Sequence, residues 1–150
     1  PIRYKARLVA KGFTQREGID YTEVFAPTTK WPTIRALVAL AAQQGWKIHQ
    51  LDVKTAFLNG DLEEEIYMTQ PEGFEIAGQE QKVCRLKKSL YGLKQAPRAW
   101  FTKLSNKMRQ LGYEVCDYQD VDATLFIKRE KGKVTYLLIF VDDLVIATGN

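Results

Sequence analysis

The residues of this sequence with the clearest potential for chemistry are two adjacent acids, Asp142 and Asp143. They interrupt the apolar run YLLIFVDDLVIATG at residues 136–149. Neighbouring carboxylates repel each other, and burying unpaired charge is costly. A hairpin turn with exposed acids is one interpretation, because aspartate is common in turns. A two-residue hairpin turn favours glycine, however, and Asp-Asp supplies none. The pair alone leaves both a turn and a functional site open.

A third acid, Asp52, lies at the end of the strand-like segment 46–53. Two strand ends of one sheet can bring Asp52 beside Asp142, and such a cluster needs a cation between its carboxylates. Oxygen ligands without histidine or cysteine favour a hard cation such as Mg²⁺. Two such ions can hold the attacking and leaving oxygens of a phosphoryl transfer. The remaining acids lie in polar stretches and are interpreted as solvated: Asp117, Asp120, Asp122 and those of residues 61–80.

The composition agrees with one folded domain that binds a polyanion. The 150 residues are 45% hydrophobic and 11% aromatic, which excludes a disordered chain. The net charge is +4, and nine Lys or Arg without any acid fall in residues 82–109. This separation favours a basic, nucleic-acid-binding surface, although two solvated faces of opposite sign remain an alternative. The apolar runs are too short for a membrane span, and Cys84, Cys116 and His49 form no metal-binding spacing.

The periodicity of apolar residues predicts the elements that position these acids. Helices are expected over 31–44 and 96–111, each with proline near its start and glycine after its end. Strands are expected over 46–53 and, three in succession, within 123–147. Residues 3–15 alternate basic and apolar side chains, which predicts a strand with one basic face. The order of these elements indicates an α+β fold with helices on an antiparallel or mixed sheet.

Four segments together resemble a known family. LDVKTAFLNGDLEEEIYM (51–68), SLYGLKQAPRAW (89–100) and FVDD (140–143) are similar, in order and spacing, to motifs of the reverse transcriptase of copia-type (Pseudoviridae) LTR retrotransposons. YKARLVAKGFTQREGIDYTEVFAP (4–27) resembles the N-terminal fingers segment of that family. The resemblance covers essentially the whole chain. It implies a fingers–palm fold, with a ferredoxin-like antiparallel sheet backed by helices.

The resemblance also implies the reaction and its catalytic acids. Asp52, Asp142 and Asp143 would be the catalytic carboxylates of an RNA-directed DNA polymerase. Two Mg²⁺ ions, or Mn²⁺, would be held by these acids and by the carbonyl of Val53. The primer 3′-hydroxyl would attack the α-phosphate of a dNTP, and pyrophosphate would leave. Phe140 stands where the family motif usually has tyrosine, so the ring is retained and the hydroxyl is absent.

Further residues acquire roles from the same resemblance. Phe57 lies five residues after Asp52, where an aromatic ring would exclude a ribose 2′-hydroxyl, although a plain core position is the alternative. Gln95 would contact the incoming nucleotide or its template base. Lys5 and Arg7 resemble fingers residues that grip the triphosphate, against the alternative of a solvated strand. The candidate contacts to the nucleic-acid backbone are Lys87, Lys88, Lys94, Arg98 and Lys103.

Residues 1–150 are therefore expected to form a single, truncated fingers–palm fragment of a Pol polyprotein, without thumb, RNase H or integrase. The expected partners are a primed RNA or DNA template, dNTP and the rest of the polyprotein, with no membrane. The resemblance implies an intracellular setting, in cytoplasmic virus-like particles with later nuclear entry. Two alternatives stay open. One is an inactive or domesticated fragment that binds nucleic acid without polymerising, and the other is a Mg²⁺-dependent nuclease.

Overall fold

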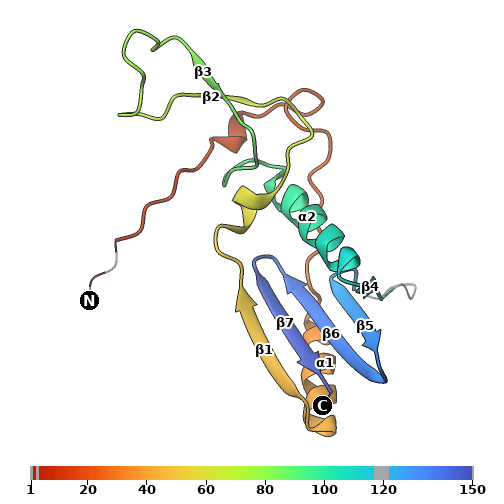
Figure 1. The fold of residues 1–150 in the computed structure, drawn as a ribbon. Coiled ribbons are helices and arrows are strands. Elements are labelled where there is room, and N and C mark those ends of the chain that lie inside the picture. The colour runs from red at the N-terminus through yellow and green to blue at the C-terminus, as the bar shows by residue number, and fades with distance from the viewer. Residues whose placement is uncertain (1, 3, 117–121, 150) are drawn as a thin grey trace. The chain divides into compact units, whose positions relative to one another are not determined.

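The computed structural model describes residues 2, 4–116 and 122–149. The chain divides into two compact units, which are described separately (Figure 1). Unit 1 comprises residues 1–25 and 57–100, and unit 2 comprises residues 26–56 and 101–150. Asp117 and Asp120, interpreted above as solvated, lie outside the described residues.

Unit 2 contains an antiparallel sheet in the strand order β1-β7-β6-β5-β4. The three successive strands predicted within residues 123–147 are β5, β6 and β7. The strand predicted over residues 46–53, with Asp52 at its end, is β1. Lys131 and Gly132 connect β5 to β6 with positive φ angles of 50° and 78°, as a tight hairpin turn requires. The strands span Lys47–Asp52 (β1), Glu114–Val115 (β4), Leu125–Glu130 (β5), Lys133–Phe140 (β6) and Asp143–Thr148 (β7).

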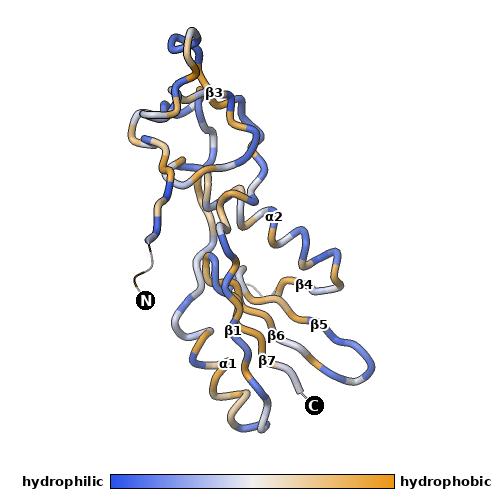
Figure 2. Tube along the Cα trace, turned by 60° about the vertical axis from the view of Figure 1, so that its left-hand side comes forward, coloured by the Kyte–Doolittle hydropathy of each residue, from blue (hydrophilic) through white to orange (hydrophobic). Residues whose placement is uncertain are grey.

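Helix α1 (Trp31–Gln44) packs on one face of this sheet (Figure 1). Proline lies at its start, and Gly45 ends it in the left-handed conformation with φ 65°, both as predicted. Leu37 and Ala41 of α1 form a buried core with Leu138 and Ala147 of the sheet. Figure 2 shows the hydrophobic stretches of β6 and β7 beside a hydrophilic β5–β6 turn. Apolar burial on this face therefore holds the sheet and α1 together.

Asp122 corrects the interpretation of the loop acids as solvated, because it is only 2% exposed. Its carboxylate accepts hydrogen bonds from the Lys30 N–H at 2.6 Å and from the Thr124 hydroxyl and N–H at 2.6 and 3.0 Å. Lys30 is the residue before α1, and Thr124 is the residue before β5. Burial alone would raise the pKa of Asp122, but these hydrogen bonds outweigh it and hold the pKa below its ordinary value. Asp122 thus connects the start of α1 to the start of β5 through hydrogen bonds.

Unit 1 contains a two-stranded antiparallel ribbon, β2 (Tyr67–Thr69) paired with β3 (Val83–Arg85). Two short 3-10 helices, Gly12–Thr14 and Ala56–Asn59, belong wholly or mostly to this unit. Its core is the buried cluster of Ile66, Leu93 and Ala96, packed against half-buried apolar residues.

The predicted basic strand over residues 3–15 is wrong for its described residues. Residues 4–11 lie in no strand, and a 3-10 helix follows them. An extended segment becomes a strand only where a neighbouring backbone supplies a ladder of hydrogen bonds. Here the Ala10 N–H donates to the Tyr91 carbonyl at 2.7 Å, and that neighbour is itself a turn. Tyr4, expected on the apolar face of the strand, is 91% exposed.

Helix α2 (Ala96–Gln110) begins in unit 1 and ends in unit 2, where residues 96–111 were predicted to be helical. Trp100, Leu104 and Met108 are buried as the periodicity predicts, whereas Leu111 beyond the helix end is exposed. Neither α1 nor α2 is long and apolar enough to cross a membrane, nor is any other helix among the described residues. The described residues contain two α-helices and two antiparallel sheets, consistent with the α+β prediction.

Candidate active site

Asp52 and Asp143 lie directly opposite each other in the sheet of unit 2. Asp52 is the last residue of β1, Asp143 is the first residue of β7, and their Cα atoms are register partners in the antiparallel ladder. Side chains of directly opposed residues lie on the same face, with Cβ atoms about 4.5–5.5 Å apart. Two acids ninety residues apart in the sequence are thus brought together by strand pairing alone.

Asp142 lies in the turn that joins β6 to β7. Phe140 and Asp143 close the hairpin as register partners, so Val141 and Asp142 are the two turn residues. The interpretation of a hairpin turn therefore holds for Asp142, whereas Asp143 is already paired as a strand residue. Val141 meets the conformational demand of the turn in place of glycine, with φ 58°. A β-branched residue in this region carries a strain of about 1–3 kcal/mol.

Hydrogen bonds hold the acidic turn against β1. The Val53 N–H donates to the Asp142 carbonyl at 2.9 Å, and the Gln50 side-chain amide donates to Asp143 Oδ1 at 3.1 Å. The backbone of Asp142 is therefore fixed, while its carboxylate is half-buried and projects from a two-residue turn. Asp52 is exposed at the same end of the sheet. This end of the sheet presents carboxylates to solvent from a rigid backbone.

Phe140 lies on the same face as two of the acids. Residues paired across a ladder share a face, and Asp143 pairs with Phe140 on one side and with Asp52 on the other. Phe140 is 42% exposed, so its ring is not simply a core side chain. Phe140 therefore places an apolar ring beside the acids at this end of the sheet.

The donor set of this end of the sheet suits a hard cation. Asp52, Asp142, Asp143 and the Val53 carbonyl supply oxygen ligands only. Among the described residues, no three His, Cys, Asp or Glu side chains already form a group that could hold a metal ion. Mg²⁺ usually takes one or two protein carboxylates and completes its shell with water and substrate phosphates. The carboxylates fit an ion that binds together with a nucleotide.

In unit 1, Phe57 and Arg7 contact the same side chain. The ring of Phe57 lies 4.9 Å from the ring of Tyr91, centroid to centroid, with an interplanar angle of 55°. The guanidinium of Arg7 lies 4.6 Å from the centroid of the same Tyr91 ring. Phe57 is half-buried and Arg7 is exposed. Sequence reasoning missed Tyr91, although it stands inside the quoted motif at residues 89–100.

Gln95 is buried, with 3% of its surface exposed. Its amide nitrogen donates to the Asp20 carbonyl at 2.8 Å, and its amide oxygen accepts from the Gln15 amide at 3.0 Å. Gln15 also accepts a hydrogen bond from the Lys94 N–H at 2.8 Å. Gln95, the residue before α2, therefore connects the start of that helix to residues 15–20. Its contact with a nucleotide or template base stays a prediction.

The predicted cationic residues all lie at the surface. Lys94 donates to the Tyr21 hydroxyl at 3.1 Å, with its ammonium 4.8 Å from the Tyr21 ring centroid. Arg98 reaches the Phe25 carbonyl at 3.5 Å. Lys103 lies on the part of α2 that belongs to unit 2. The exposed candidates are Lys5, Arg7, Lys87, Lys88, Lys94, Arg98 and Lys103.

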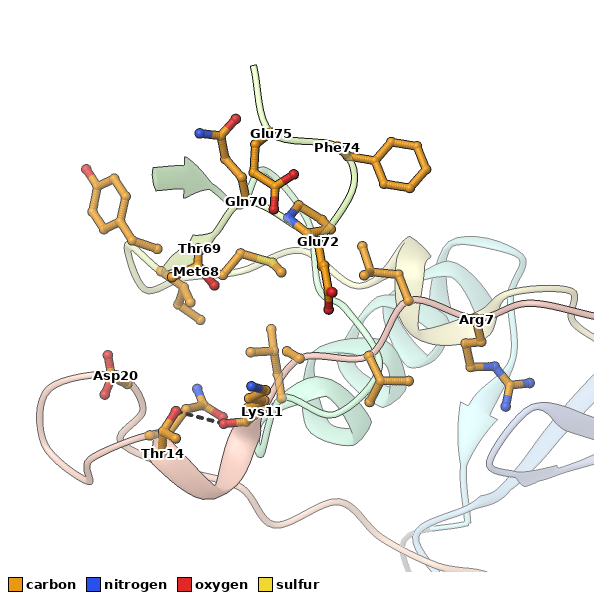
Figure 3. Close-up of a pocket in the computed structure, with 18 of the residues that line it drawn as sticks. Arg7, Lys11, Thr14, Asp20, Met68, Thr69, Gln70, Glu72, Phe74 and Glu75 are labelled. Atoms are coloured by element: carbon orange, nitrogen blue, oxygen red, sulfur yellow. Dashed lines mark hydrogen bonds between the residues drawn. The ribbon is translucent and has the colours of Figure 1, made fainter. Parts of the chain in front are cut away.

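Unit 1 also contains an open groove of about 1160 Å³. Residues 6–11 line it on one side, and β2 with the following turn at residues 69–75 lines it on the other. Figure 3 shows Lys11 and Glu72 on opposite sides, with Arg7 at one end. The Arg7 guanidinium therefore lies both at the end of this groove and over the Tyr91 ring.

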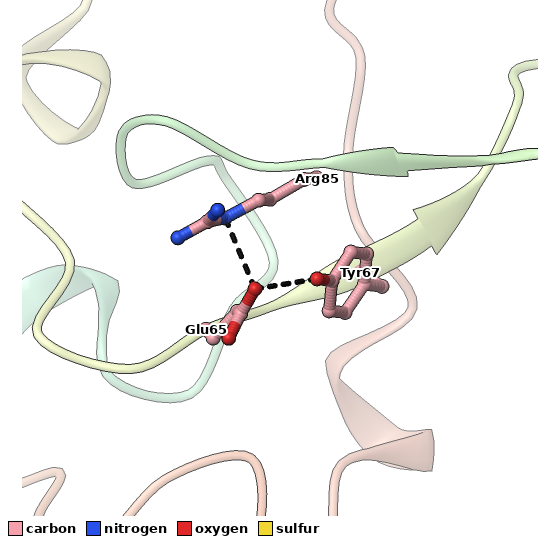
Figure 4. Close-up of polar contacts among 3 residues, drawn as sticks. All are labelled: Glu65, Tyr67 and Arg85. Carbon is pink, nitrogen blue, oxygen red and sulfur yellow. Dashed lines mark hydrogen bonds and ion pairs between the residues drawn. The ribbon is translucent and has the colours of Figure 1, made fainter.

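A polar cluster lies on the ribbon of the same unit (Figure 4). Glu65 Oε1 accepts the Tyr67 hydroxyl at 2.5 Å and pairs with Arg85 Nε at 3.3 Å. The hydrogen bond to Glu65 raises the pKa of Tyr67, since losing the phenolic proton would lose the bond. All three side chains are exposed, so the cluster is a surface feature of the β2–β3 ribbon.

Comparison with known proteins identifies the class to which this arrangement belongs. A family model described as "Reverse transcriptase (RNA-dependent DNA polymerase)" matches residues 1–150. The chain therefore belongs to the reverse transcriptase family. No solved structure matches the chain.

The relatives are retrotransposon polyproteins. The chain is 52% identical over 145 residues to the "Retrovirus-related Pol polyprotein from transposon TNT 1-94" of Nicotiana tabacum, covering 97% of this chain and 11% of that protein. It is 47% identical over 148 residues to the Pol polyprotein from transposon RE1 of Arabidopsis thaliana, covering 99% and 10%. It is 32% identical over 143 residues to the transposon Ty1-NL2 Gag-Pol polyprotein of Saccharomyces cerevisiae, covering 95% and 8%. The chain thus spans about a tenth of these relatives, and the resemblance to copia-type reverse transcriptases is confirmed.

Proposed function

We propose that this chain is the fingers–palm part of an RNA-directed DNA polymerase that extends a primer with dNTPs. The observation that carries the proposal is the pairing of Asp52 with Asp143, with Asp142 in the adjoining turn. These are the positions to which the family resemblance assigns the catalytic acids. The sheet and α1 of unit 2 would be the ferredoxin-like palm.

In this proposal the carboxylates of Asp52 and Asp142 and the carbonyl of Val53 would hold two Mg²⁺ ions, and Asp143 would be the less direct ligand. When bound, such ions lower the pKa of a hydroxyl nucleophile and stabilise charge on phosphate oxygens. The protein contributes rigidity: the bond from the Val53 N–H to the Asp142 carbonyl and the strand register hold the acids in place. The primer 3′-hydroxyl attacks the α-phosphate of the dNTP, and pyrophosphate is released.

The substrates follow from the same proposal. A primed RNA or DNA template would bind against the exposed lysines and arginines, through contacts that position the backbone without reading sequence. The triphosphate would bind near Lys5 and Arg7, and Phe57 would exclude a ribose 2′-hydroxyl. The rest of the Pol polyprotein would supply the thumb, RNase H and integrase. Virus-like particles in the cytoplasm would be the place of synthesis.

A primer-extension assay tests the proposal. A Pol polyprotein carrying this segment, given a primed RNA template, dNTPs and Mg²⁺, is expected to lengthen the primer, and a chelator is expected to stop the reaction. Degradation of the template without extension, by a polyprotein whose RNase H has been inactivated, would instead support the nuclease alternative. Nucleic-acid binding without extension would support the non-polymerising alternative.

Replacing Phe57 with alanine is expected to admit ribonucleotides. Removing the ring opens the space beside the sugar 2′ position, so we expect the preference for dNTP over rNTP to fall by about tenfold or more, as for other sites that discriminate by exclusion. Competitive incorporation of dTTP and UTP measures the ratio. Leu58→Ala, at the next residue, is the matched control. An unchanged ratio for Phe57→Ala would mean that this ring serves only the core of unit 1, because it already packs against the buried cluster of that unit.

A further inference from the structure

One aromatic ring, that of Tyr91, joins two residues that are predicted to recognise different parts of the nucleotide. Its contacts come from segments far apart in the sequence: the Arg7 guanidinium at 4.6 Å and the Phe57 ring at 4.9 Å. A guanidinium over a ring face is held by the ring quadrupole and keeps its planar donors available at its edge. A tilted aromatic pair restricts the orientation of both rings.

The backbone at Tyr91 and Gly92 is held in close contact with residues 10–12. The Tyr91 carbonyl accepts the Ala10 N–H at 2.7 Å. Gly92, with φ 91°, approaches the same segment so closely that an added Cβ would lie 2.1 Å from the Ala10 carbonyl oxygen. A Cβ at Gly12 would lie 1.9 Å from the Gly92 carbonyl oxygen. Gly12 and Gly92 therefore permit the close backbone contact between residues 10–12 and residues 91–92. Arg7 lies three residues before Ala10, which this contact holds in place.

We propose that Tyr91 is a positioning residue for the nucleotide, an inference that rests on the proposed polymerase function. Its ring orients Phe57, which excludes the sugar 2′-hydroxyl, and holds the Arg7 guanidinium ready for the triphosphate. Sugar selection and phosphate binding are thereby coupled through one side chain. The ligand class that this arrangement recognises is a 2′-deoxynucleoside triphosphate.

Replacing Tyr91 with leucine tests the coupling in a Pol polyprotein carrying this segment. We expect the KM for dNTP to rise by about two- to fivefold, the effect of losing an exposed cation–π contact. We also expect the ratio of UTP to dTTP incorporation to rise, while kcat at saturating dNTP changes less than KM. Tyr91→Phe should behave as the wild type, because both contacts use the ring. Tyr91→Met, which retains apolar bulk without a ring, serves if the leucine variant does not fold.

Double variants separate positioning from a general structural effect. In the Arg7→Ala background, Tyr91→Leu should add no further rise in KM. In the Phe57→Ala background, it should add no further ribonucleotide uptake. Tyr67→Leu, on the ribbon of the same unit, is the control and should change neither quantity.

The outcomes distinguish this inference from the proposed function. A wild-type polyprotein that does not extend primers would overturn the polymerase function and this inference with it. An active wild type with unchanged KM and unchanged discrimination in Tyr91→Leu and Tyr91→Met would overturn the positioning role alone. Additive effects in both double variants would do the same.

Discussion

Asp142→Asn is expected to reduce dNTP incorporation by about 10³-fold or more, a loss of the size that follows removal of a principal charged group from an active site. The change removes one negative charge and leaves the shape of the side chain. The Asp142 carbonyl, which accepts the Val53 N–H at 2.9 Å, is untouched, so the turn should persist. Single-nucleotide incorporation with Mg²⁺, measured in a Pol polyprotein carrying this segment, gives the rate.

Two comparisons give this result its meaning. Asp61→Asn, a neutralised acid in an exposed position of unit 1, should retain the wild-type rate. Asp143→Asn should also be impaired, because it removes the negative charge that lies opposite Asp52 in the strand register. If Asp142→Asn polymerised at the wild-type rate while remaining folded, the assignment of the catalytic end of the sheet would be wrong.

The parts of the fold that the sequence predicts well are those governed by local periodicity. Residues 31–44 carry apolar side chains at helical spacing between proline and Gly45, and α1 has those limits. The apolar runs around the Asp pair are long enough to specify β6 and β7. The pairing of β6 with β7 then follows from the short turn between them, because a two-residue turn allows few registers. The sequence placed Asp52 beside Asp142 at two strand ends, whereas the register pairs Asp52 with Asp143 and leaves Asp142 in the adjoining turn.

Contacts between distant segments could not be predicted in the same way. The alternation in residues 4–11 is that of a strand, but the neighbouring backbone is a turn at Tyr91 and offers no ladder. Gln95 is polar and precedes a helix, which is typical of a surface residue, yet partners from residues 15–20 bury it. The conformation of residues 4–11 and the burial of Gln95 both depend on the position of a segment that is distant in the sequence. For Asp122 a local signal did exist, since an aspartate two residues before Thr124 can form an Asx turn.

Asp122→Ala is expected to lower the free energy of unfolding by about 3 kcal/mol, because it removes the common acceptor of three hydrogen bonds and leaves the buried Thr124 N–H without its acceptor. The N–H of Lys30 and both donors of Thr124 lose the carboxylate that joins α1 to β5. Asp122→Asn should cost less, since the amide retains one carbonyl oxygen. Urea unfolding of the chain, followed by circular dichroism, measures both differences.

The dependence on pH identifies the charge as the cause. The pKa of Asp122 is lower in the folded protein than its ordinary value, so its stabilisation is complete above the unfolded-state pKa of about 3.9 and is lost as the pH falls through the folded value. The difference in unfolding free energy between the wild type and Asp122→Asn should therefore be constant near neutrality and should narrow below about pH 4. Glu63→Ala, at an exposed acid of unit 1, should show neither the loss nor the pH dependence. A difference that persisted unchanged to pH 2 would mean that Asp122 stabilises the unit by packing and not through its ionised carboxylate.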